Sequence, residues 1–407
     1  MMKKKSILIV LYYYLPYVSG LTGYARDLAE HLVKKGHRVT VLTTRHEKAL
    51  PEKEVINGVN VVRAPVLLKI SKGVLAPTFW LQVIRAARKS DIVNFHLPLA
   101  DVGLSSLFIK KEKIISTYHC DLNLGSGILN KIIEKLSFFL MNIVLKKSGK
   151  IVTNSIDYFS HSYFKKYINK AVQIYPPINK INFGPTDYSA LLNKLSLDEQ
   201  SYKIGFVGRI VAEKGIRYLL QSIPFMRGKI EHFYIVIAGE YGRVAGGSVI
   251  KDLTNCAAEN SDKIIFAGSL KKNELLEFYS MINVLVLPSI DPLESFGMVQ
   301  VEALLCGTPV IATNLPGVRV VINQTGAGYL IEPKNSEDLA MKLIEMKENP
   351  PEIDRRKLDQ FSLETTINQY EMVFDRPDRF ICNPEIAENI KSVPKTLPGE
   401  ADTSSTQ

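Results

Sequence analysis

Short apolar runs alternate with helical patterns along most of this chain, and this alternation limits the possible folds more than any other feature. The first run, SILIVLYYY at 6–14, is rich in β-branched and aromatic residues, which is typical of a strand buried on both faces. A helical pattern at 24–35 is closed by Gly36, and HRVTVLTT at 37–44 is the next expected strand. Such strand–helix–strand units predict an α/β fold with a doubly wound parallel sheet.

The alternation occurs in two series. The first continues with strands expected at 59–65, 91–96, 113–119 and 150–154. The segment IYPPINKINFGP at 174–185 then breaks the rhythm with three prolines and a glycine, which is typical of a linker between domains. The second series follows, with strands expected at 203–208, 233–239, 262–268, 284–289, 309–313 and 328–332.

Two series of this kind predict two domains, because a chain of 407 residues is too long for one ordinary core. We expect Rossmann-like domains over 1–178 and 179–362 that face each other across a deep cleft. The helical pattern at 363–376 is expected to pack back on the N-terminal domain. The tail 377–407, rich in Pro, Glu, Ser and Thr, is expected to be disordered.

Positive charge is concentrated in the first half of the chain. Residues 1–180 carry 28 Lys and Arg against 11 Asp and Glu, a net charge of +17, whereas the remainder carries 23 against 30, a net charge of −7. This asymmetry predicts that the N-terminal half meets an anionic surface, and we favour a membrane. A nucleic acid is the alternative, but no zinc finger or basic helix of recognition type supports it.

One segment of the basic half combines charge with an apolar stripe. Residues 128–147 contain lysines at 131, 135, 146 and 147, and further basic residues lie at 69–89 and 110–113. Basic amphipathic helices lie in bilayer interfaces, although such stripes commonly pack into the core of the protein instead. The sequence leaves both interpretations open.

Neither a membrane span nor a metal site is expected. The apolar run after the N-terminal lysines reads better as a buried strand than as a signal peptide, and no run reaches the length of a spanning helix. The four cysteines are scattered without a C-x-x-C spacing, which favours a reducing compartment. We therefore expect a cytoplasmic protein, peripheral on the inner face of the cell membrane.

Several segments resemble glycosyltransferase family 4, a retaining family with the two-domain GT-B fold. They are PYVSGLTGYARDLAEHLVKKGHRVTVLT in the N-terminal half, and GRIVAEKGIRYLLQSI, FAGSLKKNELLEFYSMINVLVLPSI and ESFGMVQVEALLCGTPVIAT in the C-terminal half. The last segment contains an E-x7-E motif, Glu294 to Glu302. The combination with the upstream G-R-x-x-x-E-K-G pattern makes the resemblance specific, and it covers the chain to about Phe374.

Arg209 and Lys214 follow a predicted strand that ends at Gly208, and a helix is expected to begin near Lys214. A strand-to-helix turn offers free amides, and two cations placed there suit a diphosphate. The resemblance implies that this arginine and lysine bind the donor's phosphates and stabilise the departing nucleotide, so that no metal or other cofactor is required. The alternative is a pair of solvated surface charges.

The E-x7-E motif is expected to contact both ends of a nucleotide sugar. Ser295 is a candidate helix cap, and the amides of Phe296, Gly297, Met298 and Val299 would then face phosphate. The resemblance implies that Glu294 contacts the transferred sugar and that Glu302 binds the ribose. For Glu302 the alternative is an exposed position on the helix.

The N-terminal half supplies fewer candidates. His119 ends a predicted strand, and the carboxyl ends of parallel strands line the ligand crevice. The resemblance implies that His119 lies beside the reacting sugar, and His96 is the competing choice. Asp121 is a weaker candidate for the acceptor side. Gly20 matches the second residue of the family's Gly-Gly loop, and Ser19 replaces the first, at a cost if it must adopt positive φ.

Three positions depart from the family pattern. Val320 stands where a glutamate is usual, the loop at 240–247 is longer than usual, and Asn283 replaces a common aspartate. The loop puts the base and ribose contacts in doubt. None of the three removes the set formed by Arg209, Lys214, Glu294 and Glu302.

The sequence thus predicts a retaining hexosyltransferase that uses a UDP- or GDP-sugar and a glycan or lipid-linked acceptor in surface polysaccharide or glycolipid synthesis. A sugar-nucleotide epimerase of the same fold, a phosphorylase and a non-catalytic nucleotide-sugar scaffold are the alternatives. The nucleotide base, the hexose, the acceptor and the oligomeric state are not specified by these patterns.

Overall fold

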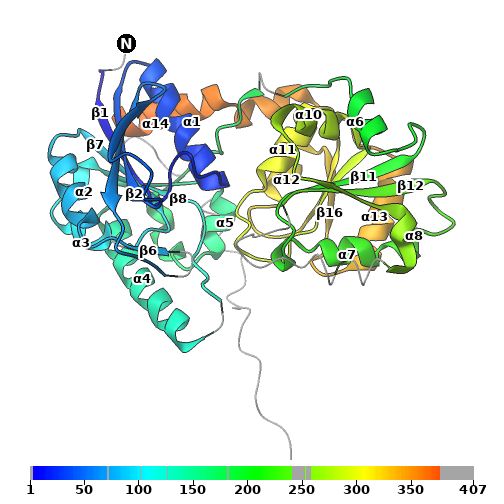
Figure 1. Ribbon diagram of the computed structural model, residues 1–407, viewed down its shortest axis with the longest axis horizontal. Helices are drawn as coiled ribbons and strands as arrows, with labels where there is room; N and C mark the ends of the chain where they lie inside the picture. The colour runs from blue at the N-terminus through cyan, green and yellow to red at the C-terminus, as the bar shows by residue number, and fades with distance from the viewer. Residues whose placement is uncertain are drawn as a thin grey trace, which may run out of the picture.

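The computed structural model contains two α/β lobes joined side by side (Figure 1). It describes residues 3–70, 73–100, 102–125, 127–180, 183–240, 253 and 258–375. The expected tail at 377–407 and most of the loop at 240–247 lie outside these residues. Each lobe contains one main sheet with helices packed on its faces, which confirms the predicted fold class.

The N-terminal sheet has eight strands in the order β10-β9-β8-β7-β1-β2-β4-β3, and only the β3–β4 pair is antiparallel. Its strands are β1 (Ser6–Val10), β2 (Arg38–Arg45), β3 (Lys53–Ile56), β4 (Val59–Pro65), β7 (Ile92–Leu97), β8 (Ile114–Tyr118), β9 (Lys150–Thr153) and β10 (Ala171–Gln173). The short strands β5 (Leu68–Ile70) and β6 (Gly73–Leu75) form a separate hairpin. The helices of this domain are α1 (Gly20–Lys34), α2 (Phe79–Arg88), α3 (Val102–Leu107), α4 (Ile128–Lys147) and α5 (Ile156–His161).

The C-terminal sheet has six parallel strands in the order β13-β12-β11-β14-β15-β16. They are β11 (Tyr202–Val207), β12 (Phe233–Ala238), β13 (Ile264–Gly268), β14 (Val284–Leu287), β15 (Val310–Thr313) and β16 (Gly328–Ile331). The accompanying helices include α6 (Ser189–Lys194), α7 (Ile216–Gln221), α8 (Ile223–Met226), α10 (Lys272–Met281), α11 (Met298–Leu305), α12 (Val320–Thr325) and α13 (Ser336–Glu348). The strand order reverses between β11 and β14, and such a reversal creates the crevice in which open α/β sheets bind ligands.

The strands that the sequence did not predict lack a long apolar run. The edge strand β3 alternates exposed and half-buried residues, and β10 has only three residues. In contrast, β14 and β15 are buried along their whole length, and their mostly apolar sequences made them predictable.

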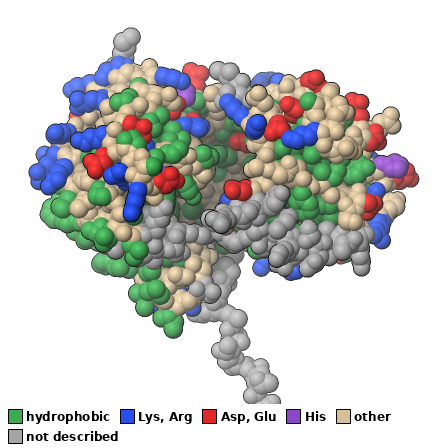
Figure 2. All heavy atoms as spheres, in the orientation of Figure 1, with side chains coloured by type: hydrophobic (Ala, Val, Ile, Leu, Met, Phe, Trp, Pro, Cys, Tyr) green, Lys and Arg blue, Asp and Glu red, His purple; other side chains and the backbone are tan. Residues whose placement is uncertain are grey.

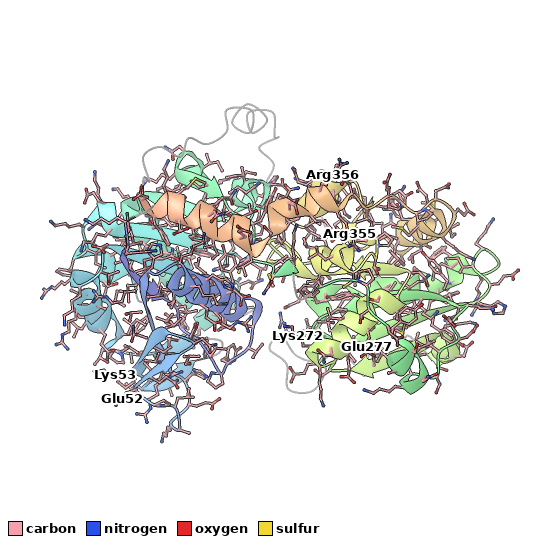
Figure 3. All side chains as sticks on the ribbon, turned by 90° about the horizontal axis from the view of Figure 1, so that it is seen from above. Glu52, Lys53, Lys272, Glu277, Arg355 and Arg356 are labelled. Carbon is pink, nitrogen blue, oxygen red and sulfur yellow. The ribbon has the colours of Figure 1, made fainter. Side chains whose placement is uncertain are left out.

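The chain returns to the N-terminal lobe at its end. A 3-10 segment (Arg355–Phe361) leads into α14 (Leu363–Asp375), and Figure 3 shows this orange helix passing from the C-terminal lobe, where Arg355 and Arg356 lie, to the N-terminal lobe. The buried residues of α14 join the core formed by β1, β2 and α1. Polar contacts add to this packing, because Glu371 accepts a hydrogen bond from His37 Nε2 at 3.0 Å.

Candidate active site

The switch point of the C-terminal sheet joins two of the predicted site residues. Lys214 lies in the loop after β11, Glu294 lies in the loop after β14, and the Lys214 ammonium donates a hydrogen bond to Glu294 Oε2. Only 19% of each side chain is exposed, so this ion pair is partly shielded from water. The structure thus places one cation and one carboxylate where a parallel sheet of this topology binds its ligand.

Arg209 lies at the same edge of the sheet. Its guanidinium donates to Glu213 Oε1 at 2.7 Å, within the same loop. The loop starts at Gly208, whose φ of 151° lies outside the range that other residues readily adopt. Close packing explains a second glycine here, because a Cβ on Gly239 would collide with the carbonyl oxygen of Gly208.

The helix expected near Lys214 begins two residues later, at Ile216. Residues 212–214 form a single 3-10 turn, Gly215 adopts a left-handed conformation with φ 68°, and α7 begins only at Ile216. A side chain at Gly215 would meet the carbonyl oxygen of Pro288, so the break is imposed by packing of the two loops. Since α7 has six residues, the positive charge of this loop comes from Arg209 and Lys214 rather than from a long helix dipole.

The helix of the E-x7-E motif, α11, does not have the expected N-cap. The N-cap of α11 is Gly297, in a left-handed conformation with φ 75°, and not Ser295. Met298 and Val299 occupy the first two helical positions, whose amides have no carbonyl partner within a helix. The side chain of Phe296 is buried and packs against Tyr175 and Phe361, so only its main chain remains available to a ligand.

Glu302 lies in the middle of α11 and is partly buried. Its Oε2 accepts a hydrogen bond of 2.7 Å from the hydroxyl of Tyr279 in α10. Burial raises the pKa of the Glu302 carboxyl above its ordinary value, and the bond from Tyr279 opposes this shift. Glu302 is therefore not a freely solvated helix position, and its second oxygen remains as a hydrogen-bond acceptor.

The two competing histidines of the N-terminal domain form one unit. His119 follows β8, His96 lies within the neighbouring strand β7, and His96 Nδ1 is 3.0 Å from His119 Nε2. His96 is 1% exposed and His119 is 7% exposed. Burial lowers the pKa of His119 to about 3 and that of His96 well below its ordinary value, so both rings are neutral. The rings of Tyr24 and His119 pack in a T-shaped arrangement, with their centroids 4.9 Å apart.

The Gly20 loop shows why Ser19 carries no conformational cost. Ser19 has extended backbone, φ −156°, and serves as the N-cap of α1. Its hydroxyl accepts from the amide of Thr22 at 3.2 Å, and Thr22 Oγ1 accepts from the amide of Ser19 at 2.7 Å. Gly20 is the first residue of α1 and lies on the same carboxyl edge of the N-terminal sheet as His119.

Asn154, which the sequence analysis did not select, connects the candidate site residues of the two domains. Tyr118 and Thr153 are paired in register between β8 and β9, so the residues that follow them, His119 and Asn154, lie side by side. Asn154 Nδ2 lies 3.5 Å from the hydroxyl of Ser295, which is adjacent to Glu294. Asn154 ends the predicted strand at 150–154. His119 was selected because it ends a predicted parallel strand, and the same criterion would have selected Asn154.

A second interdomain contact was also missed. Asp157 at the start of α5 accepts hydrogen bonds from Arg319 Nη2 at 2.6 Å, from Arg319 Nε at 2.9 Å and from the amide of Gly317 at 2.9 Å. Arg319 precedes Val320, the position at which the family pattern has its glutamate. The contact joins the N-terminal domain to the loop before α12, and the space-filling view shows the recess between the two lobes (Figure 2).

Two further residues of the sequence interpretation have internal partners. Asn283 exchanges hydrogen bonds with the main chain of Lys203, so this residue links β11 to β14. Asp121 accepts from the amide of Tyr163 and from the hydroxyl of Tyr118. The structure therefore gives Asp121 a role in holding its own loop.

Comparisons with known proteins agree with this architecture. The family model described as "Glycosyltransferase Family 4" matches residues 18–161, and the one described as "Glycosyl transferases group 1" matches residues 187–363. An uncharacterized glycosyltransferase of Methanocaldococcus jannaschii is 28% identical over 335 residues, which are 79% of this chain and 84% of that protein.

Two solved structures extend the likeness to nearly the whole chain. The sucrose-phosphate synthase of Thermosynechococcus elongatus superposes with a TM-score of 0.72 at 18% identity, over 92% of this chain and 99% of that one. HepE of Anabaena in complex with UDP-glucose superposes with a TM-score of 0.63 at 19% identity, over 96% and 100%.

The fold and the matched segments define a glycosyltransferase with the GT-B fold. The chain belongs to glycosyltransferase family 4, with a C-terminal half of the group 1 type. None of the comparisons favours the epimerase, phosphorylase or scaffold alternatives. Within the described part of the chain, no helix has both the length and the apolar character needed to cross a bilayer.

Proposed function

We propose that this glycosyltransferase transfers a hexose from a UDP- or GDP-sugar to a glycan or lipid-linked acceptor, with retention of anomeric configuration and without a required metal. The ion pair between Lys214 and Glu294 carries this proposal. It joins the two loops at the switch point of the donor-side sheet, where a diphosphate and its sugar would lie next to each other. The UDP-glucose bound by the similar Anabaena protein supports a nucleotide sugar as the donor.

The charges of the site suit departure of a nucleoside diphosphate. As the bond from the anomeric carbon to the diphosphate breaks, negative charge accumulates on the phosphate oxygens. Lys214 and Arg209 are held at the edge of the sheet, and fixed cations of this kind stabilise such charge without reorganisation. We infer that they supply what a metal ion supplies in other transferases.

The two carboxylates of the E-x7-E motif would bind the sugar and the ribose of the donor. Glu294 is positioned by Lys214 to accept hydrogen bonds from hydroxyls of the sugar, and Glu302, positioned by Tyr279, accepts from the ribose. His119 and Asn154 approach from the N-terminal domain. The acceptor oxygen would attack from the face that the diphosphate leaves, and the acceptor's proton would depart with the diphosphate.

Turnover of a donor panel by matched lysine variants tests this proposal. Release of UDP or GDP is followed for the wild type, Lys214→Ala and Lys342→Ala, where Lys342 is paired with Glu345 on α13. Loss of a preorganised charge contact costs about 10²–10³-fold in kcat, so Lys214→Ala should show this loss and Lys342→Ala should not. Equal activity of all three proteins, or a product with inverted anomeric configuration by NMR, would contradict the proposal.

We further propose that the acceptor is reached at an anionic membrane on the cytoplasmic side. Residues 128–139 of α4 expose an apolar face of five residues, each 57–82% exposed. This face, called the α4 face, consists of Ile128, Leu129, Ile132, Leu136 and Phe139. The exposed Lys131 and Lys135 lie among these residues. Figure 2 shows hydrophobic side chains gathered on this part of the N-terminal lobe, below the basic surface.

The neighbouring helix enlarges this surface. α3 packs on α4 and exposes Leu104 and Leu107, and Phe108, which directly follows α3, is exposed as well. The second half of α4 instead packs inward through Met141, Val144 and Leu145. An apolar face of this size with lysines among its residues suits the interface of an anionic bilayer.

Flotation with vesicles tests the membrane proposal. The variant Ile132→Asp/Phe139→Asp should lose binding to phosphatidylglycerol-containing vesicles, because it places two charges in the α4 face. Met341→Asp is the matched control, since Met341 is a similarly exposed apolar residue on α13 of the other domain. Equal flotation of the three proteins, or equal binding to vesicles of phosphatidylcholine alone, would contradict it.

A further inference from the structure

A row of three hydrogen-bonded polar side chains leads from the interior of the N-terminal sheet to the site. Asn94 and His96 lie two residues apart in β7, so both point to the same face of the sheet. Asn94 Oδ1 is 2.9 Å from His96 Nε2, and His96 Nδ1 is 3.0 Å from His119 Nε2. Asn94 and His96 are almost completely buried, so no bulk water competes for these bonds.

The orientation of the Asn94 amide is fixed by its other bonds. Asn94 Nδ2 donates to the main-chain carbonyl of Ile115 at 3.2 Å and to Thr117 Oγ1 at 3.0 Å. A carbonyl oxygen can only accept, so the nitrogen of the amide must face Ile115. The oxygen must then face His96, and His96 Nε2 must donate to it.

This orientation determines the protonation of both rings. A neutral imidazole carries a single proton, so a His96 ring protonated on Nε2 has an unprotonated Nδ1 that only accepts. His119 Nε2 lies against this Nδ1 and must therefore be the donor. The remaining nitrogen of His119, Nδ1, is left with a lone pair. T-shaped packing against the Tyr24 ring limits rotation of the His119 ring.

We propose that Asn94 and His96 are positioning residues that hold His119 as its Nε2-protonated tautomer, so that Nδ1 accepts a hydrogen bond from a hydroxyl of the transferred sugar or the acceptor. The inference rests on the proposed function, which places a sugar beside His119. If Asn94 were absent, His96 could donate from Nδ1 instead. His119 would then carry its proton on Nδ1 and present a donor where an acceptor is required.

The tautomers can be observed directly in the free protein. The full chain, labelled with ¹⁵N at its seven histidines, is studied by long-range ¹H–¹⁵N NMR, with His96→Gln and His119→Gln used for assignment. The proposal requires Nε2–H and an unprotonated Nδ1 in both rings at neutral pH. A His119 ring protonated on Nδ1 would overturn it, whatever the activity of the enzyme.

The kinetic consequence is tested with a matched pair of variants. Asn94→Ala removes the group that orients His96. Ser116→Ala is the matched control, because it removes a buried side-chain hydrogen bond, to Ser148, from the opposite face of the neighbouring strand β8. Asn94→Ala should lower kcat about tenfold, the effect of one misplaced hydrogen bond, with KM for the donor within about twofold of the wild-type value. Ser116→Ala should keep both kcat and the His119 tautomer.

The outcomes separate this inference from the proposed function. If Asn94→Ala retains the wild-type kcat, or if KM rises as much as kcat falls, the positioning role is overturned while the transferase assignment stands. If no donor is turned over by the wild type, the proposed function and the catalytic part of the inference both fail. The tautomer spectrum then still decides whether Asn94 and His96 set the state of His119.

Discussion

The contact between Asp157 and Arg319 should determine how often the two domains separate beside the donor site. Asp157 belongs to α5 of the N-terminal domain, and both Arg319 and the amide of Gly317 belong to the C-terminal domain. Removal of the carboxylate by Asp157→Ala breaks three hydrogen bonds across the domain boundary. It leaves the arginine, which is about a quarter exposed, to be solvated by water.

The expected magnitude follows from this geometry. A net hydrogen bond to a charged group contributes about 1.5–3 kcal/mol, but exposure of both partners reduces the value for the pair. We take about 2 kcal/mol for the three contacts together, since they share one carboxylate and are not additive. At 1.4 kcal/mol per factor of ten, opening at this contact becomes about 30-fold more frequent.

Amide hydrogen exchange measures this opening because the Gly317 amide is itself part of the contact. Peptides that contain Gly317 should exchange about 30-fold faster in Asp157→Ala than in the wild type. Ser160→Ala, which removes a hydrogen bond to the main-chain carbonyl of Asp157 but keeps the Asp157 carboxylate, should leave the rate unchanged. An unchanged rate in Asp157→Ala would show that the pair does not hold the domains together.

Two further predictions concern the donor side. Gly239→Ala should lower the free energy of unfolding by about 1–3 kcal/mol, because the added Cβ collides with the Gly208 carbonyl and the residue has a strained φ. Gly23→Ala is the control, since Gly23 lies in α1 with open space around it, and it should be neutral or stabilising. Urea unfolding measures both changes. Equal stability of the two variants would contradict the close packing at Gly208. Glu302→Gln should stabilise the protein at pH 7 but weaken nucleotide binding. The stabilisation is expected because the folded state raises the pKa of the Glu302 carboxyl. The wild type therefore loses stability as the pH rises from the ordinary value of 4.5 through the folded-state pKa, and glutamine does not. The stability difference from the wild type should disappear below pH 4.5 in thermal unfolding, and a difference independent of pH would contradict the raised pKa.

The sequence predicted the fold well because the central strands have a simple pattern. Strands such as β1 and β14 are covered on both faces along almost their whole length, so their sequences are nearly continuous apolar runs. The edge strand β3 has water on one side, and three-residue β10 is too short to show a period. The apolar pattern therefore predicted the central strands of each sheet, but it did not predict the edge strands β3 and β10.

Helix starts beside the site were predicted less well, for a steric reason. Ser295 has the chemistry of a cap, yet Gly297 is the cap. A Cβ at Gly297 would meet Leu287 and Gln300, and its left-handed conformation favours glycine. The same holds for Gly215, which delays α7 until Ile216. Local residue preference does not show how closely two loops from different parts of the chain approach one another.

The interdomain residues illustrate a different limit. Asn154 and Arg319 are ordinary polar residues in the sequence, and their importance comes only from the residues opposite them, Ser295 and Asp157. His96 and His119 were treated as competitors because the sequence does not show that β7 and β8 are adjacent. Once the strand order is known, the two histidines are partners.

The central claim is that Arg209, Lys214 and the E-x7-E residues form a nucleotide-sugar site that needs no metal. The most direct test is thermal unfolding of the purified full chain with millimolar UDP- and GDP-sugars, with and without EDTA. A ligand at 100 times its Kd stabilises the folded state by about 2.7 kcal/mol, so a clear rise in midpoint is expected with one nucleotide class. The rise should survive EDTA and disappear in Arg209→Ala. No rise with any nucleotide sugar, or a rise that EDTA abolishes, would contradict the claim.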